Sequence, residues 1–417
     1  MIRSGSGFVN CEPYSSSLPQ WPRTWTIAAP VHFGFFQILL LISATVTVAS
    51  IGYCLFCIWA GVRFASKRKG STIVAAVLPP VSILKPVKGS DPEMYEALCS
   101  HCVQDYPEYE ILFGISDGND PAIPVVEKLI REFSERTIRM VQCEKQLGAN
   151  GKVSTLAQLV PGASHEILLV NDSDIRVEPD YLRTVVTELQ RPDTGLVTCL
   201  YRGTPAATLG SSLEALGIST DFVPGVLAAR QIEGGMRFGL GSTLAFHKHD
   251  LEAIGGFEAI ADYLADDYEL GRRIAERGRR VELSNSVVET HLPAYDLAGF
   301  FRHQVRWART IRTARPAGYA GLLLTFTLPW AAWTLVLAPR VPWEWTLAAV
   351  ALVARLTSAV VCGKLVLRDK QLPRSLWLLP VRDFLALAVW ITGWMGRKIV
   401  WRGLKFEIRQ GKLARIE

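Results

Sequence analysis

The chain has 417 residues, a formal net charge of +6 and a hydrophobic content of 49%. Its mean hydropathy of +0.20 is high for a soluble enzyme, so composition predicts membrane segments joined to a soluble domain. Basic residues lie beside the apolar segments, and no aromatic and basic RNA-binding motif is present, which indicates a membrane surface and excludes nucleic acid as a partner. The scattered cysteines require no disulfide and fit a reducing compartment.

Residues 1–32 are polar and rich in Ser, Pro and Gly, and we expect them to form a loose tail rather than a signal peptide. Residues 33–62 contain no charged residue, so this segment is long enough for a transmembrane helix. A basic run, Lys67-Arg68-Lys69, follows it. The positive-inside rule therefore predicts that the next domain lies in the cytoplasm.

Strands and helices alternate at short spacing over residues 78–312, which predicts an α/β domain with a mixed, mostly parallel, doubly wound sheet. The expected strands are 81–84, 109–116, 138–142, 166–170, 195–200 and 280–291, and the expected helices are 123–133, 153–159 and one that begins at Asp266. Ligands bind beyond the carboxyl ends of strands in such a sheet. Polar residues that follow these strands are therefore the candidate site.

The strand 166–170 is entirely apolar after its first residue and leads directly to Asp172-Ser173-Asp174. Unpaired carboxylates are costly at the end of a buried strand, so packing alone does not explain both of them. Oxygen ligands at this spacing suit Mg²⁺ or Mn²⁺ shared with a diphosphate, although a turn or a helix cap is the structural alternative. Lys152, at the start of the next predicted helix upstream, is a candidate to bind phosphate.

Three later segments also carry candidate residues. The glycine-dense segment 234–242 fits either a backbone that passes close to a ligand or a plain loop. Asp266 and Asp267 stand at a helix start, where one acid is enough to complement the helix dipole and the second is available as a general base. His291 ends a strand, and Arg306-Trp307 lies in a basic amphipathic segment that faces either phosphate or the membrane surface.

Residues 317–395 contain three further apolar segments, at 317–339, 345–367 and 376–395. Arg355 and Lys364 weaken the second of them, and Pro380, Arg382 and Asp383 interrupt the third. If all of them crossed the bilayer, the basic tail 396–417 would lie outside, against the charge rule. We therefore expect one C-terminal segment to be interfacial or re-entrant.

Five motifs occur in an order and spacing that resemble the ceramide glucosyltransferase family, whose members have the GT-A fold and include bacterial hopanoid-biosynthesis glycosyltransferases. The resemblance covers roughly residues 33 to 340, and the segment 197–203 looks like the bacterial branch. The motifs are Lys85-Pro86-Val87-Lys88-Gly89-Ser90-Asp91-Pro92, Asp117-Gly118-Asn119-Asp120-Pro121-Ala122, Asn171-Asp172-Ser173-Asp174-Ile175-Arg176-Val177, Ala265-Asp266-Asp267-Tyr268 and Arg306-Trp307.

The resemblance implies a role for each matching residue. It implies a metal and sugar-diphosphate site at Asp172 and Asp174, and catalytic roles for Asp267 as the base and for Arg306 and Trp307. Because the leaving group needs charge neutralisation, we expect a divalent ion bound by Asp174 with His291. Two positions depart from the family pattern, because Asp266 stands where Glu is frequent and His303 stands where Gln or Arg is expected. The implied nucleotide-sugar-binding residues are Lys85, Asp91, Asp117, Lys152, Asp172 and Asp174.

The expected reaction is a single displacement with inversion, in which Asp267 deprotonates a lipid hydroxyl and Mg²⁺ or Mn²⁺ neutralises the UDP leaving group. The expected partners are UDP-glucose and ceramide in the bilayer, with the enzyme a multi-pass protein of the bacterial inner membrane. The alternatives are transfer from UDP-N-acetylglucosamine to a hopanoid polyol, a processive polysaccharide synthase, or a non-catalytic receptor or transporter. His303 argues against the synthase, and the acids at strand and helix ends argue against the receptor.

Overall fold

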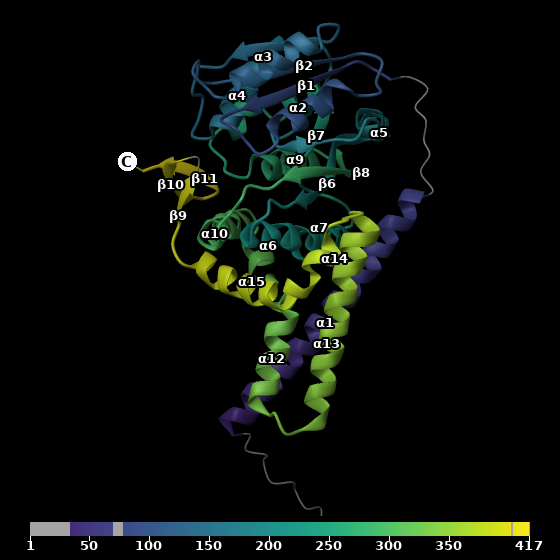
Figure 1. The fold of residues 1–417 in the computed structure, drawn as a ribbon, viewed down its shortest axis with the longest axis vertical. Helices are drawn as coiled ribbons and strands as arrows, with labels where there is room; N and C mark the ends of the chain where they lie inside the picture. The colour runs from purple at the N-terminus through teal and green to yellow at the C-terminus, as the bar shows by residue number, and fades with distance from the viewer. Residues whose placement is uncertain (1–33, 70–77, 402, 417) are drawn as a thin grey trace, which may run out of the picture.

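The computed structural model describes residues 34–69, 78–401 and 403–416. The predicted N-terminal tail, 1–32, lies outside the described residues. The chain forms a globular α/β domain above a stem of apolar helices, and the C-terminus returns to the side of the globular domain (Figure 1). The first stem helix, α1 (Phe35–Lys69), continues beyond the predicted end at residue 62, so that Arg63, Lys67 and Arg68 lie in its last turns.

The globular domain contains one eight-stranded sheet in the order β3-β2-β1-β4-β7-β6-β8-β5. β7 and β5 run opposite to the other strands, so the sheet is mixed and mostly parallel as expected. The strands are β1 (Val81–Val87), β2 (Tyr109–Ile115), β3 (Thr137–Gln142), β4 (Ile167–Val170), β5 (Ile175–Arg176), β6 (Thr194–Thr204), β7 (Leu244–His247) and β8 (Arg280–His291).

Apolar side chains on both faces of the sheet explain why helices cover it on both sides. In β4, Leu168 and Val170 belong to one buried cluster, while Ile167 and Leu169 belong to another. The first cluster includes α4 (Gly151–Leu159) and α9 (Asp266–Glu276). The second includes α2 (Met94–Cys102), α3 (Ile123–Glu132) and α5 (Tyr181–Leu189). This two-sided packing confirms the doubly wound prediction.

Three helices connect the sheet to the stem. α6 (Leu209–Gly217) and α7 (Val223–Ile232) are joined by one π-helical turn, Ile218–Phe222, and α7 packs against α1. α10 (Leu297–Ala314) packs against α6. The apolar segment 209–226, whose composition would suit lipid contact, is therefore largely buried against other helices.

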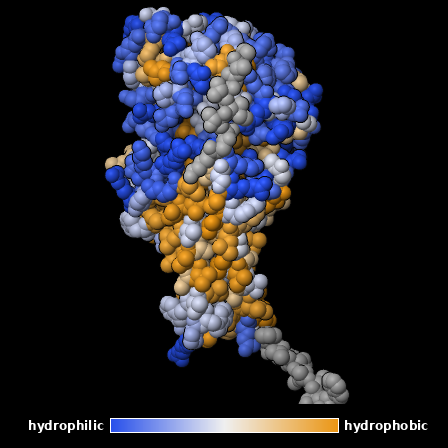
Figure 2. Space-filling model, turned by 90° about the vertical axis from the view of Figure 1, so that its right-hand side faces the viewer, coloured by the Kyte–Doolittle hydropathy of each residue, from blue (hydrophilic) through white to orange (hydrophobic). Residues whose placement is uncertain are grey.

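The stem consists of α1, α12 (Thr327–Leu337) and α13 (Pro342–Val360), which pack against one another. Hydrophobic side chains cover its surface, whereas the globular domain is mostly hydrophilic (Figure 2). In the described part of the chain, three helices are long and apolar enough to cross a membrane: Phe35–Arg68, Pro342–Val366 and Leu372–Trp394. A fourth candidate, formed by Pro316–Thr325 and Thr327–Leu337, is bent by 51°. These helices indicate association with a membrane.

The last apolar helix does not continue the stem. α15 (Leu379–Trp394) follows the short α14 (Leu372–Ser375), packs against α10 and runs across the base of the globular domain at a steep angle to α13 (Figure 1). An interfacial position for this segment remains our prediction, and its orientation agrees with it.

The segment expected to be a basic tail is instead a three-stranded antiparallel sheet of β9 (Lys398–Trp401), β10 (Leu404–Arg409) and β11 (Lys412–Arg415). Its apolar residues Ile399, Phe406, Ile408 and Leu413 pack with Leu264 of the globular domain. The β10–β11 turn has Gln410 and Gly411 at φ values of 50° and 83°, the conformation that a tight hairpin favours. The many basic residues of this segment obscured the alternation of apolar residues that is typical of strands.

Candidate active site

Four charged side chains meet where β4, α4 and α9 converge at the carboxyl end of the sheet. Lys152 is in the first turn of α4, and its Nζ lies 2.8 Å from Oδ1 of Asp172 and 3.1 Å from Oδ2 of Asp266. Asp267 is the next residue of α9. We call Lys152, Asp172, Asp266 and Asp267 the acidic cluster. Burial alone would lower the pKa of Lys152, but the carboxylates of Asp172 and Asp266 outweigh it and raise the pKa.

Asp267 is held by the backbone rather than by a cation. Its Oδ2 accepts a hydrogen bond of 2.7 Å from the amide of Gly241, and its Oδ1 accepts one of 2.8 Å from the amide of Tyr268. A Cβ at position 241 would lie 3.0 Å from Oδ2 of Asp172 and 3.4 Å from Oδ2 of Asp267. The glycine-dense segment therefore passes so close to both carboxylates that a side chain would crowd them.

The electrostatic environment prepares Asp267 for proton transfer. Burial, followed by the charge of Asp266, raises the pKa of Asp267 to about 6, and Lys152 opposes this effect. Asp266 forms an ion pair with Lys152, whereas Asp267 forms no ion pair with any of the described residues. A carboxyl group with a pKa near neutrality is suited to act as a general base.

Asp174 and Asp91 lie beside the acidic cluster. The hydroxyl of Thr290 in β8 donates to Oδ2 of Asp174 at 2.5 Å, and the hydroxyl of Ser173 donates to Oδ2 of Asp91 at 2.5 Å. Burial and the charge of Asp172 raise the pKa of Asp174 to about 6. A hard divalent cation shared with a diphosphate would relieve this repulsion, so the oxygen donors of Asp172 and Asp174 fit such an ion.

His291 is not brought to Asp174. Its Nδ1 lies 3.0 Å from Glu93 and its Nε2 lies 3.1 Å from Glu289, and the bond to Glu289 raises its pKa. Side chains alternate between the faces of a strand, so His291 lies on the face of β8 opposite to Thr290. Within the described ranges, no three His, Cys, Asp or Glu side chains converge as a metal-binding group. Metal ligation by His291 thus requires a rearrangement and stays a prediction.

Two predicted nucleotide-sugar ligands lie apart from the acidic cluster. β1 extends past the predicted end at residue 84, so that Lys85 is fully buried and donates from Nζ to the carbonyl of Asp172 at 3.1 Å. Burial lowers the pKa of Lys85 to about 7. Lys85 thus supports the backbone of Asp172 and is buried in this structure, and its contact with a nucleotide sugar stays a prediction. Asp117 is exposed at the end of β2 and accepts a hydrogen bond from the amide of Asn119.

Arg306 and Trp307 lie on α10, where they adjoin an aromatic and acidic group that includes Glu214 of α6. Trp307 donates from Nε1 to Nε2 of His303 at 3.2 Å, and Nδ1 of His303 lies 3.2 Å from Oε1 of Glu214. Gln304 donates to the other oxygen of Glu214 at 2.9 Å. His303, whose role the sequence left open, and Gln304 therefore both link α10, the helix that carries Arg306 and Trp307, to α6.

Two tyrosines adjoin this group. The ring of Tyr295 stacks on that of His303, and the ring of Tyr201 contacts Phe222, which in turn contacts Trp307. Burial raises the pKa of Tyr201, and the charges of Glu214 and then Asp267 raise it further. Burial and Glu214 raise the pKa of Tyr295 to about 12, against the opposing effect of Arg306.

The sequence did not reveal Glu214, Tyr201 or the structural role of Asn171. A single Glu within the apolar segment 209–226 was the available signal for Glu214, because an unpaired buried carboxylate is costly. Asn171 is fully buried, and it bonds His101 at 3.1 Å and the carbonyl of Ser242 at 2.7 Å. His101 of the Cys99-Ser100-His101-Cys102 motif is thus a core residue, and the described cysteines are free.

The sheet order and the acidic cluster at its carboxyl edge define a GT-A-type glycosyltransferase. A mannosyltransferase from Pyrobaculum calidifontis, solved with GDP-Man and Mn²⁺, has the same fold, with a TM-score of 0.51, 22% identity and coverage of 85% of this chain and 99% of that one. Residues 42–414 match the family model of glycosyl transferase family 21. The chain therefore belongs to this family, that of the ceramide glucosyltransferases, which confirms the resemblance seen in the motifs.

Individual relatives are more distant. The chain is 26% identical to ceramide glucosyltransferase 3 of Caenorhabditis elegans over 233 residues, which are 56% of this chain and 50% of the relative. It is 36% identical to the ceramide glucosyltransferase of Komagataella phaffii over 130 residues, which are 30% of this chain and 25% of the relative. The chain thus spans half or less of the length of these relatives.

Proposed function

We propose that the protein is a membrane-bound, inverting glycosyltransferase that moves glucose from UDP-glucose to the hydroxyl of ceramide. The observation that carries this proposal is the arrangement of the acidic cluster at the carboxyl end of the sheet. Asp267 is bound by a backbone amide there, and beside it Lys152 forms ion pairs with Asp172 and Asp266. The similarity to two ceramide glucosyltransferases supports the choice of donor and acceptor. Because the chain covers only part of these relatives, both substrates belong to the proposal.

The proposed chemistry is a single displacement. Asp267 takes the proton of the acceptor hydroxyl while the hydroxyl oxygen forms a bond to the anomeric carbon, and the bond from that carbon to the UDP oxygen breaks with the electron pair on UDP. No second carboxylate is required as a nucleophile. An α-linked UDP-sugar would therefore yield a β-glycoside.

The negative charge that develops on UDP requires compensation. Asp172 and Asp174 would hold Mg²⁺ or Mn²⁺, which when bound supplies a Lewis acid to the diphosphate. Lys152 orients Asp172 through its ion pair, and Arg306 is the candidate cation on the α10 side. Asp91 and Asp117 remain proposed contacts of the nucleotide.

The acceptor would enter from the bilayer. α10 and α6 lie between the acidic cluster and the apolar stem, so a lipid hydroxyl could reach Asp267 while the apolar chains stay near the stem (Figure 1). We also propose that the globular domain is cytoplasmic in a bacterial inner membrane, because Arg63, Lys67 and Arg68 stand at the end of α1 nearest this domain.

A turnover assay in detergent tests the proposal. The full chain is offered labelled UDP-glucose or UDP-N-acetylglucosamine together with ceramide or a hopanoid polyol, with Mg²⁺, Mn²⁺ or a chelator. We expect glucosylceramide with a β-linkage, read from the anomeric proton by NMR. Transfer of N-acetylglucosamine to the hopanoid polyol would replace the proposed substrates by the alternative pair, and an α-linked product would contradict inversion.

Variants separate catalysis from binding. Asp267→Asn should lower kcat by about 10²- to 10⁴-fold while UDP-sugar binding persists, because it removes only the base. Glu276→Gln is the matched control, since Glu276 is an exposed acid on the same helix. Equal activity of Asp267→Asn and Glu276→Gln would exclude Asp267 as the base.

A further inference from the structure

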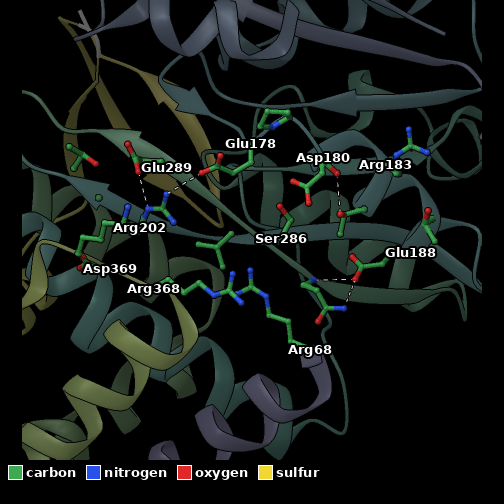
Figure 3. Close-up of a pocket in the computed structure, with 18 of the residues that line it drawn as sticks. Arg68, Glu178, Asp180, Arg183, Glu188, Arg202, Ser286, Glu289, Arg368 and Asp369 are labelled. Carbon is green, nitrogen blue, oxygen red and sulfur yellow. Dashed lines mark hydrogen bonds and ion pairs between the residues drawn. The ribbon is translucent and has the colours of Figure 1, made fainter. Parts of the chain in front are cut away.

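A pocket lies on the face of the β6–β8 pair opposite to the acidic cluster. In these paired strands, Tyr201 and Thr290 face the carboxylates of the active site, while Arg202 and Glu289, which lie opposite each other in the strand register, face the pocket. The pocket has a volume of about 970 Å³, which is sufficient for a lipid headgroup or a small anionic ligand (Figure 3).

Three arginines from distant parts of the chain meet in this pocket. Arg68 comes from the last turn of α1, Arg202 from β6, and Arg368 from the segment after the π-helical turn Val361–Val366. Figure 3 shows the guanidinium groups of Arg68 and Arg368 pointing toward each other at the centre, with Arg202 to one side. Like charges repel, so Arg368 and Arg202 each act against the charge of Arg68, and an anion between the guanidinium groups would relieve this repulsion.

The other charges in the pocket are already compensated. Arg202 lies 2.9 Å from Glu289 and 3.7 Å from Glu178. Glu188 accepts hydrogen bonds from the backbone and side chain of Asn285, and Asp369 accepts one of 2.8 Å from Ser219 and one of 2.8 Å from the amide of Gln371. The remaining carboxylate in the lining is Asp180, which together with Glu188 attracts Arg68 at longer range, and the other two lining arginines, Arg183 and Arg191, pair with Asp105 and Glu188.

Arg68 and Arg368 are left without a carboxylate partner in the described ranges. Arg68 donates a hydrogen bond to the carbonyl of Val366 at 3.3 Å, which uses one of its N–H groups but does not compensate its positive charge. Arg368 forms neither an ion pair nor a side-chain hydrogen bond with the described residues, and its φ of 56° is rare for a residue with a Cβ. Because Arg368 is also exposed at the pocket, its guanidinium group is available to bind an anion there.

We propose that this pocket binds a phosphate-bearing anion between Arg68 and Arg368, and that an anionic phospholipid of the bilayer supplies it. A guanidinium group matches phosphate oxygens with two parallel hydrogen bonds. Arg68 ends the candidate span Phe35–Arg68, and Arg368 follows the end of the candidate span Pro342–Val366. Basic pockets between spans at this level of a membrane bind anionic headgroups, and a free phosphate ester is the second source of the same chemistry.

Thermal unfolding of the full chain in detergent tests the site without turnover. The probes are short-chain phosphatidylglycerol, phosphatidylcholine of the same chain length, and glycerol 3-phosphate. Stabilisation by phosphatidylglycerol alone is expected. Equal stabilisation by glycerol 3-phosphate would assign the site to soluble phosphate esters, and no difference between phosphatidylglycerol and phosphatidylcholine in the wild type would overturn the proposal.

A matched pair of double variants locates the site. Arg68→Gln with Arg368→Gln should weaken phosphatidylglycerol binding by about tenfold or more, since it removes both charged donors. Lys67→Gln with Lys364→Gln removes the same charge from the same two segments at exposed residues outside the pocket, and should bind as the wild type does. Equal losses of phosphatidylglycerol binding in both double variants would show that general surface charge, and not this pocket, attracts the lipid. If the first pair fails to fold, Arg68→Lys with Arg368→Lys should show an intermediate loss.

This inference concerns a site separate from the acidic cluster and does not depend on the proposed donor or acceptor. Failure of the binding test would leave the transfer assay unaffected, and failure of the transfer assay would leave the binding test valid.

Discussion

Adjacent acids at the start of α9 have different environments. Asp266 forms an ion pair with Lys152, whereas Asp267 is bound by two backbone amides. The sequence predicted this pair of positions because two carboxylates exceed what one helix dipole requires. It also predicted Asp172 and Asp174, since they follow an apolar strand. It did not reveal that Lys85 is buried within β1, because the burial of a lysine within a strand depends on a backbone carbonyl from another element.

The raised pKa of Asp267 predicts the acid limb of the rate profile. Burial and Asp266 raise this pKa to about 6, and only the deprotonated carboxylate is a base. The value of kcat/KM should therefore be constant above about pH 7 and fall about tenfold per pH unit below pH 6. The measurement is the pH profile of transfer with the metal held saturating. A rate that stays level down to about pH 4.5 would show that Asp267 titrates in its ordinary range.

At the scale of helices, α6 and α10 are joined through one buried carboxylate. Both oxygens of Glu214 are occupied, one by His303 and the other by Gln304. His303 in turn accepts from Trp307 one helical turn later. The Arg-Trp pair could be located from the sequence but this support could not, since contacts between two helices distant in the chain leave no periodic signal.

Replacement of Glu214 tests this support. Glu214→Ala leaves His303 and Gln304 without their acceptor, and we expect a loss of about 1–3 kcal/mol in the free energy of unfolding together with a lower kcat/KM. Thermal unfolding and transfer rates measure the two effects. Glu214→Gln keeps one acceptor and should lose less of both, and Glu252→Gln, at an exposed position of α8 (Lys248–Ala253), should change neither. If Glu214→Ala loses stability but retains full kcat/KM, α10 does not depend on Glu214 for catalysis.

The C-terminal sheet is the element least expected from the sequence, and it contacts the loop that leads into α9. The amide of Leu413 donates to the carbonyl of Asp262 at 2.7 Å, and the amide of Leu264 donates to that of Gly411 at 3.3 Å. The side chain of Leu413 is buried against Leu264. The sheet therefore restrains the residues just before Asp266.

Leu413→Ala should loosen this restraint. Truncation of a buried leucine costs about 2–5 kcal/mol at the site, and we expect hydrogen exchange to increase in residues 261–266 and kcat to fall. Lys405→Ala, at an exposed position of β10, is the control. Faster exchange confined to residues 396–416, with unchanged kcat, would show that the sheet folds independently of the active site.

At the scale of the whole molecule, buried ion pairs join the stem to the globular domain. Arg355 of α13 donates to Asp383 of α15 at 2.7 Å and to Asp221 of the π-helical turn at 2.5 Å. Arg382 lies 3.1 Å from Asp221 and donates to Gln304 of α10 at 2.9 Å. In the sequence, Arg355 and the Arg382-Asp383 pair count against membrane-spanning helices in two apolar segments. The structure brings these charges together, so that they compensate one another. This compensation depends on the three-dimensional arrangement of the helices, so the sequence does not reveal it.

This pairing predicts a non-additive pair of substitutions. Arg355→Leu leaves the buried carboxylate of Asp383 without the cation that binds it, while half-buried Asp221 keeps its contact with Arg382, and the change should cost about 3–5 kcal/mol in stability. Arg355→Leu combined with Asp383→Leu removes charges of both signs and should be more stable than Arg355→Leu alone, although each change removes a native contact. Thermal unfolding of the two variants in the same detergent measures the difference. If the double variant is less stable than the single one by the full cost of Asp383→Leu, the two charges are independent. The ion pair between Arg355 and Asp383 would then provide no energetic coupling between α13 and α15.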